Sequence, residues 1–504
     1  MKRLKLFMWN TCILVITAFF VRGISMFFQV YISNRIGSEG IGIFSLLSSL
    51  TIFVVTFANS GIYLSATRLV AESLAKGKTA RAYYTIRKCM RYSLFFGVLA
   101  AILLISSTSY IVRFLLHSQI SAISLYIIAF SLPFTSLITS LEGYFVAVKK
   151  VSKNSLNQIL GVLLKIGISI LLLGNMSSFS IDSACISLMI AHTLSEAISF
   201  VYLYFCYYRN KQKNAYSFNS SSEDTRGILK QILHISFPVA ITSYIRSGLS
   251  TLKQMLIPIR LEKSGLSCEE AISSYGIIQG MVMPVLLFPS ILIRSFSSLL
   301  IPEFARYHVK KDYPRMQQVI SIIFQTTCFF SIGTLGIFFL FSNTISILLY
   351  QGANIGKFLL LLCPCICFMY LDDMIDAILK GLDEQLNVMY CNILDLVVSI
   401  FCIYFLVPLY GIYGYIMVIM ISEILNFSIS LMQLYKATHF SFSILNNIIL
   451  PIFSLLLTIF LVNFFPIATL SWWYFIVFVL LFFILYTIFY FLFSSFLSIL
   501  SSNR

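Results

Sequence analysis

Residues 472–497 read WWYFIVFVLLFFILYTIFYFLFSSFL, a stretch that contains no Asp, Glu, Lys or Arg. A helix that crosses the hydrocarbon core of a bilayer needs about 20 mainly apolar residues. The apolar residues follow one another directly, without the alternation that is typical of a transmembrane β-strand. This stretch therefore predicts a membrane-spanning helix.

The rest of the chain has the same character. Of its 504 residues, 59% are hydrophobic and 11% are charged, against about 45–50% and 25% in soluble domains. Thirteen further apolar windows leave no segment above about 25 residues for a soluble domain. We therefore predict an all-α integral membrane protein with fourteen transmembrane helices. The predicted spans are residues 9–33, 42–66, 92–112, 120–147, 155–174, 182–207, 229–258, 273–300, 318–342, 358–379, 387–407, 412–435, 446–464 and 472–497.

The net charge of +16 is distributed unevenly. When loops are assigned to alternate sides with the N-terminus inside, and Lys230 at the very start of the span 229–258 is counted with the loop before it, 25 of the 35 Lys and Arg residues fall on the cytoplasmic side, 5 outside and 5 within spans. This asymmetry follows the positive-inside rule. It predicts that both termini are cytoplasmic, and that the basic loops contact anionic membrane lipids and not nucleic acid.

A nearly constant shift along the sequence aligns the first half of the chain with the second, and it places Glu142 on Asp372 and Lys150 on Lys380. The shift maps spans 1–6 onto spans 7–12, which predicts two pseudo-symmetric six-helix lobes followed by two C-terminal helices. Because six is an even number, the repeats are parallel, an arrangement that places a transporter's site between two bundles. The predicted domains are 1–225, which ends in a cytoplasmic linker, 226–440 and 441–504.

Three groups of motifs, which extend over most of residues 1–440, carry a resemblance to a known family. They are IGSEGIGIF at 36–44 with ATRLVAE at 66–72, Tyr275-Gly276 with Gly280, Pro284, Pro289 and LIPE at 300–303, and ILKGL at 378–382 with VPLYGIYG at 407–414. In order and spacing these motifs resemble the multidrug/oligosaccharidyl-lipid/polysaccharide (MOP) exporter superfamily, and within it the stage V sporulation protein B-like branch. The resemblance implies a bacterial inner-membrane flippase for lipid-linked saccharides.

Span 1 departs from the related lipid II flippases. Those proteins tend to carry a second arginine one to two turns after the first, where this chain has Phe27, Phe28 and Gln29. Recognition of the lipid head group is therefore expected to differ.

Basic side chains inside spans are costly and usually face a bundle interior or water. By the resemblance, spans 1, 2, 7 and 8 line the central cavity, and they contain Arg22, Arg246, Lys253 and Arg294. Arginine offers a planar fork of donors and lysine a point charge, so four cations there would suit an anionic pyrophosphate. The alternative is that some of them pair with acids in other helices or with helix C-terminal carbonyls.

Acidic side chains inside spans predict a second kind of site. Asn392 and Asp395 lie about one turn apart on the predicted helix, and we expect a coupling-ion site for Na⁺ or H⁺ there. A structural, hydrogen-bonded acid or a pair with Lys165 remains open. His192 and Glu196 share a helix face, but without a second acid or histidine nearby in sequence we expect packing and not a relay.

Motifs for enzymatic chemistry are missing from the sequence. It contains no P-loop, no GxSxG and no HExxH, the motifs of nucleotide binding and hydrolysis. Cys363, Cys365 and Cys367 lack a fourth ligand and the usual zinc spacing. We therefore expect no enzyme, no catalytic residues, no metal and no other cofactor.

These observations predict a monomeric, multi-pass flippase of the bacterial cytoplasmic membrane. It would move an undecaprenyl-pyrophosphate-linked saccharide by alternating access of the two lobes. A MATE-like, cation-coupled drug antiporter is one alternative, although such transporters favour an acidic cavity. An integral-membrane glycosyltransferase or polymerase is the other, although it would need a long external loop and the longest one predicted is residues 259–272.

Overall fold

The structure is a computed structural model of the chain. Its described residues are helical and contain no strand. The prediction of an all-α membrane protein is confirmed. The described residues are 2–114, 121–174, 180–213, 227–350, 355–440, 442–463 and 472–502.

Eleven helices in the described part are long and apolar enough to cross a membrane, and one bent pair raises the number to twelve. Two of these helices, α1 (Lys2–Asn59) and α14 (Gln385–Thr438), each contain a break. The breaks are Gly37, with φ 75° and ψ −178°, and Gly411, with φ 57° and ψ −133°, conformations that glycine adopts without steric cost. Each break falls between two predicted spans, so α1 and α14 together account for four of the fourteen.

The described chain forms two compact units. Unit 1 consists of Met1–Phe28 and Ile43–Met255, and unit 2 of Gln29–Gly42 and Leu256–Arg504. These bounds cut through α1 and α7 (Ile228–Glu262) and differ from the predicted division at residue 225. Within the predicted linker, residues 214–226 lie outside the described residues, and the domain division stays a prediction.

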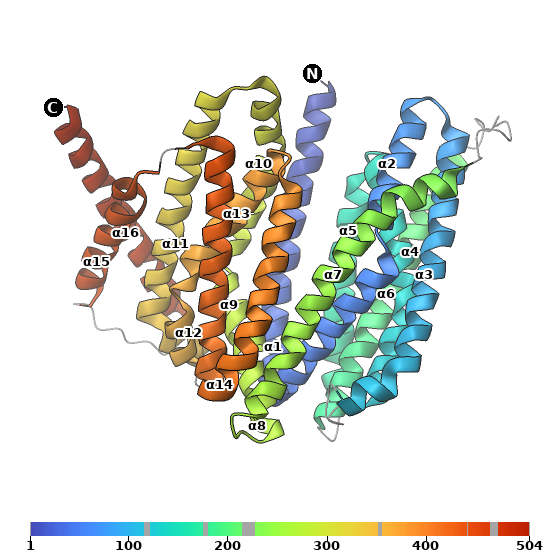
Figure 1. Ribbon diagram of the computed structural model, residues 1–504, viewed down its shortest axis with the longest axis horizontal. Helices are drawn as coiled ribbons and strands as arrows, with labels where there is room; N and C mark the ends of the chain where they lie inside the picture. The colour runs from blue at the N-terminus through green and yellow to red at the C-terminus, as the bar shows by residue number, and fades with distance from the viewer. Residues whose placement is uncertain are drawn as a thin grey trace. The chain divides into compact units, whose positions relative to one another are not determined.

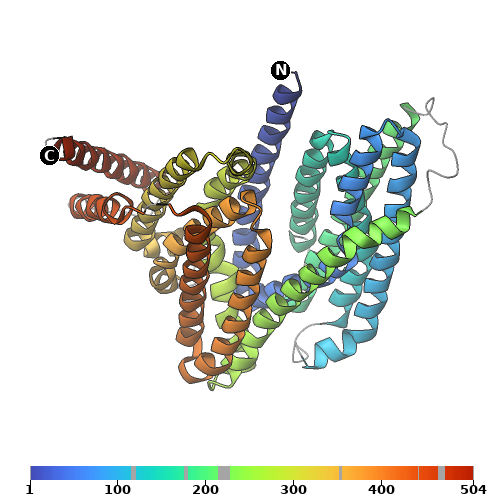
Figure 2. The same ribbon diagram turned by 45° about the horizontal axis from the view of Figure 1, so that its top comes forward.

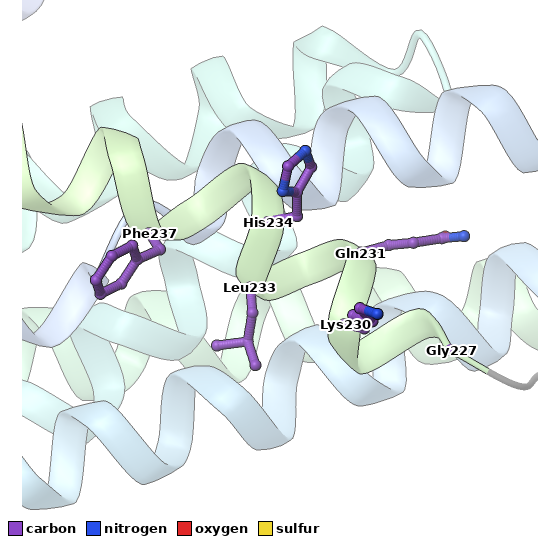
Figure 3. A pocket seen from close by; sticks show the side chains of 6 residues that line it. All are labelled: Gly227, Lys230, Gln231, Leu233, His234 and Phe237. Atoms are coloured by element: carbon purple, nitrogen blue, oxygen red, sulfur yellow. The ribbon is translucent and has the colours of Figure 1, made fainter.

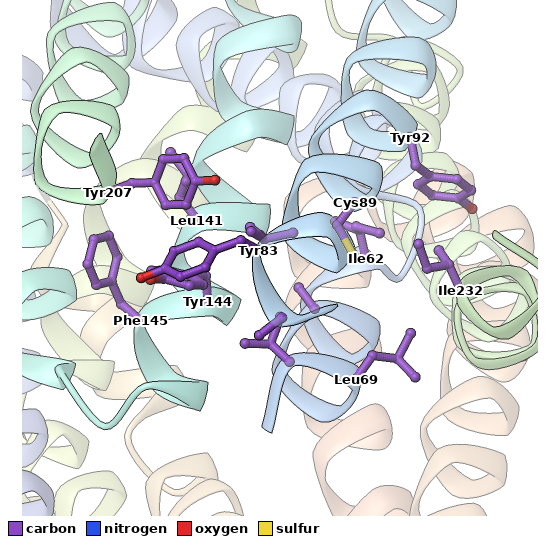
Figure 4. Packing of buried hydrophobic residues seen from close by; sticks show 14 of the residues in the cluster. Ile62, Leu69, Tyr83, Cys89, Tyr92, Leu141, Tyr144, Phe145, Tyr207 and Ile232 are labelled. Atoms are coloured by element: carbon purple, nitrogen blue, oxygen red, sulfur yellow. The ribbon is translucent and has the colours of Figure 1, made fainter. Parts of the chain in front are cut away.

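Unit 1 is built around α4, which packs against its neighbours on several sides (Figures 1 and 2). A buried cluster ties one end of these helices together, and it includes Tyr83, Tyr144 and Tyr207 (Figure 4). The Asn210 amide donates to the Tyr144 hydroxyl at 2.7 Å, and the Tyr83 hydroxyl donates to the Asn210 carbonyl at 3.3 Å. Besides parts of α1 and α7, the helices of unit 1 are α2 (Ile62–Ala75), α3 (Thr79–Phe114), α4 (Ala122–Ala147), α5 (Val151–Gly174) and α6 (Ile181–Lys213).

Unit 2 is built in a similar way around α13, which packs against α10, α11 and α14. The predicted span at 273–300 is not one straight helix, because π-helical turns and two prolines divide it into four elements. The elements of unit 2, besides α14 and parts of α1 and α7, are α8 (Cys268–Gly276), η3 (Ile277–Val282), α9 (Met283–Leu287), α10 (Ser290–Lys310), α11 (Tyr313–Leu349), α12 (Gly356–Leu362), α13 (Cys365–Gly381), η4 (Leu445–Ile449), α15 (Leu450–Val462) and α16 (Trp472–Ser502).

Helix bounds repeat between the two units. One constant offset separates the starts of α3 and α11, of α4 and α12, and of α5 and α14. The turns that precede α5 and α14 also carry a positive φ at equivalent residues, Lys149 (60°) and Asp383 (67°). This offset exceeds the shift that places Glu142 on Asp372 by about one helical turn, so Glu142 is equivalent to Asp376 and not to Asp372.

Candidate functional site

The four basic side chains predicted to bind substrate lie on three helices. Arg22 is on α1, and Arg246 and Lys253 are on α7, all within unit 1. Arg294 is on α10, in unit 2. Arg22, Arg246 and Arg294 are exposed and Lys253 is half-buried. Three of the four cations thus belong to one compact unit, while their convergence on one ligand stays a prediction.

A polar cavity of about 360 Å³ in unit 1 contains Arg246. It is formed by the second part of α1 and by α7, which contribute several serine and threonine side chains to its lining beside Arg246. Arginine surrounded by hydroxyls offers only hydrogen-bond donors or adaptable groups to an anion. The lining residues are Ser49, Ile52, Thr56, Ser243, Arg246, Ser247, Ser250, Thr251 and Gln254.

The hydroxyls of this cavity differ in their hydrogen bonding. The Thr251 hydroxyl donates to the Ser49 carbonyl at 3.1 Å, and the Ser49 hydroxyl donates to the Leu46 carbonyl at 2.8 Å. In contrast, the Ser247 Oγ atom is buried without a hydrogen-bond partner in the part of the chain that is described. Such a group costs free energy unless something binds it, so Ser247 and Arg246 together are suited to an oxygen-rich anion.

Arg294 has an acidic partner. Its Nε atom donates to Asp373 Oδ2 at 2.7 Å, which joins α10 to α13 in an ion pair. The side chains are 40% and 25% exposed, so solvent or a ligand can reach the pair. This is the kind of pairing with an acid of another helix that the sequence left open, and a phosphate would have to compete with Asp373.

The predicted coupling-ion residues are both in the first part of α14. Asp395 Oδ1 accepts a hydrogen bond from the Ser422 hydroxyl at 2.6 Å, and the Ser399 hydroxyl donates to Ser422 at 3.0 Å. The Asn392 amide instead donates to the Val388 carbonyl of its own helix at 2.7 Å. The fold therefore adds Ser422, from beyond the Gly411 break, to the neighbourhood of Asp395.

A second acid lies close to this group. Asp372 Oδ2 accepts from the Asn426 amide at 2.7 Å, and Asp372 interacts electrostatically with Asp395. The remaining side-chain oxygens of Asp372 and Asn426 are buried and have no hydrogen-bond partner among the described residues. Carboxylate and amide oxygens are ligands for hard cations, and Asn426 and Ser422 are members of this candidate site that sequence spacing did not identify.

A second, more open cavity of about 800 Å³ lies at the start of α7. Its lining combines the polar residues Lys230 and His234 with the apolar residues Leu233 and Phe237, all on this one helix (Figure 3). The neighbouring Gln231 accepts a hydrogen bond from Arg81 of α3 at 3.5 Å. None of the predicted site residues lines this cavity.

The chain matches known proteins along most of its length. The family described as polysaccharide biosynthesis protein matches residues 7–308. Stage V sporulation protein B of Bacillus subtilis (strain 168) is 21% identical over 386 residues, 75% of this chain and 73% of that protein. Sporulation protein YkvU of the same organism is 22% identical over 407 residues, 79% of this chain and 88% of that protein.

Solved structures show the same fold. The inward closed conformation of the lipid II flippase MurJ aligns with a TM-score of 0.71 and 15% identity, over 96% of this chain and 98% of that chain. An inward-facing MATE family multidrug resistance transporter of the MOP superfamily aligns with a TM-score of 0.64 and 12% identity, over 85% and 100%. These findings confirm the resemblance seen in the sequence. The chain is a multi-pass membrane protein with the MOP superfamily fold, and it belongs to the polysaccharide biosynthesis protein family.

Proposed function

We propose that the protein is a flippase for an anionic, undecaprenyl-pyrophosphate-linked saccharide, such as a precursor of the cell wall, the spore cortex or a polysaccharide. The observation that carries this proposal is Arg246 in a cavity lined by serine and threonine hydroxyls. The family, the two sporulation relatives and the fold shared with a lipid II flippase support it.

The chemistry of the Arg246 cavity suits a phosphate better than a cationic drug. A guanidinium group binds two phosphate oxygens at once, and the hydroxyl of Ser247 can bind a third. Arg22, Lys253 and Arg294 would add positive charge along the path of the head group. A cationic drug would instead be repelled by Arg246, which disfavours the antiporter alternative.

Movement of the lipid head group would follow from alternating access. Cation binding at Asp395, with Asn392 and Ser422 nearby, would bias the lobes toward one orientation if the ion binds the two orientations with different affinity. Na⁺ and H⁺ are the candidate coupling ions. The protein would act as a monomer in the bacterial cytoplasmic membrane with both termini inside, and it would need no catalytic residue and no cofactor.

The proposal is tested by reconstituting the full chain with a panel of fluorescent undecaprenyl-linked lipids. The measured quantity is the fraction of each lipid that becomes accessible from the opposite leaflet. We expect transport of at least one pyrophosphate-linked saccharide, and loss of that transport in Arg22→Ala and in Arg246→Ala. A phosphate bound in the cavity would enclose its contact with Arg246, and removal of one partner from such an enclosed contact costs about 2–5 kcal/mol, or at least tenfold in affinity.

Two further variants serve as controls. Arg246→Lys keeps the charge but loses the fork, so we expect partial activity. Arg68→Ala removes an arginine that pairs with Glu72 on α2, 64% exposed, and should leave transport unchanged. Full activity of Arg246→Ala, or transport of cationic drugs and of no lipid, would contradict the proposed function.

A further inference from the structure

Four ionisable side chains that the proposed function does not use lie on three consecutive helices of unit 1. They are Glu142 on α4, Lys165 on α5, and His192 and Glu196 on α6, and α6 packs against both α4 and α5. Lys165 interacts electrostatically with Glu196 and with His192, and Glu142 interacts with Glu196. The fold thus supplies the partners that His192 and Glu196 lack nearby in sequence.

The group extends from one end of the helices toward their middle. Glu142 is five residues before the end of α4, and Lys165 is fourteen residues after the start of α5. At 1.5 Å per residue, they lie about 8 Å and about 21 Å along their helices from the α4–α5 turn. The side chain of Gln158, at an intermediate height on α5, hydrogen-bonds Glu142. A polar row therefore leads from this turn into the apolar interior of the unit.

Unpartnered atoms along this row point to a ligand. The Nε2 atom of His192 is buried and has no hydrogen-bond partner in the described structure. The side-chain oxygens of Asn154 and Asn157 on α5 are also buried without a partner among the described residues, and both side chains are only 4% exposed. Buried polar groups are normally satisfied. Atoms of this kind are suited to water and to a proton that enters from the α4–α5 turn.

The charges of the row define what it can bind. Lys165 and Glu196 compensate each other, which leaves His192 at the inner end and Glu142 at the outer end to change charge. From α2, Tyr63 interacts electrostatically with Glu142. An imidazole and a carboxyl close to the opposite charges of Lys165 and Glu196 can each gain or lose one proton, a function that chains of Glu and His perform inside membrane transporters.

We propose that Glu142, Lys165, His192 and Glu196 form a proton site in unit 1, separate from the Asp395 group of unit 2. The ligand is H⁺, which is taken from water and held at His192 or Glu142. Only the coupling of this proton to lipid movement rests on the proposed function, because binding of the proton itself does not require a lipid substrate.

The test is a titration of the full chain in lipid nanodiscs, followed by NMR of ¹⁵N-labelled histidine. The chain has five histidines, and the signal that disappears in His192→Gln belongs to His192. If that variant does not fold, replacement of the other four histidines assigns the same signal. We expect the His192 signal to titrate, its midpoint to rise in Lys165→Met, which removes a neighbouring positive charge, and the midpoint to shift in the double variant Lys165→Met with Glu196→Gln as well.

Glu72→Gln is the matched control, because this acid pairs with Arg68 on the exposed side of α2. It should leave the His192 midpoint unchanged. A His192 signal that does not titrate, or a midpoint that Lys165→Met leaves in place, would overturn the proton site. Because no lipid substrate takes part in the titration, this failure would leave the flippase proposal standing, and failure of the lipid assay would leave the proton site standing.

Discussion

At the scale of single residues, the Arg246 cavity contains two hydroxyls with opposite expected roles. Ser247 Oγ has no hydrogen-bond partner in the described residues, whereas the Thr251 hydroxyl bonds the Ser49 carbonyl. Ser247→Ala should therefore keep or slightly raise the melting temperature while it slows lipid transport. Thr251→Val should lower the free energy of unfolding by about 1 kcal/mol. Equal destabilisation by both variants in thermal unfolding would contradict the view that the Ser247 hydroxyl binds a ligand and does not stabilise the fold.

Single residues also show what the sequence could and could not predict. The high cost of burying charge in a membrane singles out residues such as Arg294 and Asp395 without any knowledge of the fold. Their partners, Asp373 and Ser422, are 79 and 27 residues away along the chain. The spacing of residues along the sequence identifies only neighbours on one face of the same helix. Contacts between different helices could therefore not be deduced from it.

At the scale of elements, the break in α1 depends on one glycine. Gly37 has φ 75°, and a Cβ atom there would contact nothing within 4 Å, so the cost of Gly37→Ala is purely that of the backbone. We expect a loss of about 1–3 kcal/mol in the free energy of unfolding. Gly167→Ala on α5 is the control, because a Cβ atom also meets open space there and alanine favours a regular helix by about 1 kcal/mol. A Gly37→Ala protein as stable as the wild type would show that the break is not needed.

The elements themselves were largely predictable because length and apolarity identify a membrane span. The exact alignment of the two repeats, that is, which residue of unit 1 is equivalent to which residue of unit 2, was not predictable. Polar residues recur at successive turns of a helix, so several shifts of the sequence give similar matches. The helix ends in the structure determine this alignment, because the starts of α4 and α12 differ by the same offset as those of α5 and α14. Proline positions indicated breaks near Pro284 and Pro289, but nothing in the sequence indicated the π-helical turns of η3.

At the scale of the whole molecule, the uneven distribution of Lys and Arg between the loops predicts which loops face the cytoplasm. If the excess of Lys and Arg marks the cytoplasmic side, a cysteine introduced at Ser221 in a cysteine-free background should react only with reagent applied from inside. A cysteine at Ser264, in the loop before α8, should react from outside. Reaction of Ser221→Cys from outside would refute this topology, and the parallel repeat would then need another explanation.

Energy coupling also belongs to the whole molecule, since an ion can drive transport only by binding the two lobe orientations unequally. Asp395 bonds Ser422 across the Gly411 break and interacts with Asp372 of α13, so an ion there would join three helical segments of unit 2. Asp395→Asn should keep lipid binding and abolish the response of transport to an imposed Na⁺ or H⁺ gradient. Asp383→Asn, in an exposed turn of the same unit, should respond like the wild type. If wild-type transport in proteoliposomes ignores both gradients and follows membrane potential alone, Asp395 is a structural acid, and its bond to Ser422 is sufficient to explain its presence.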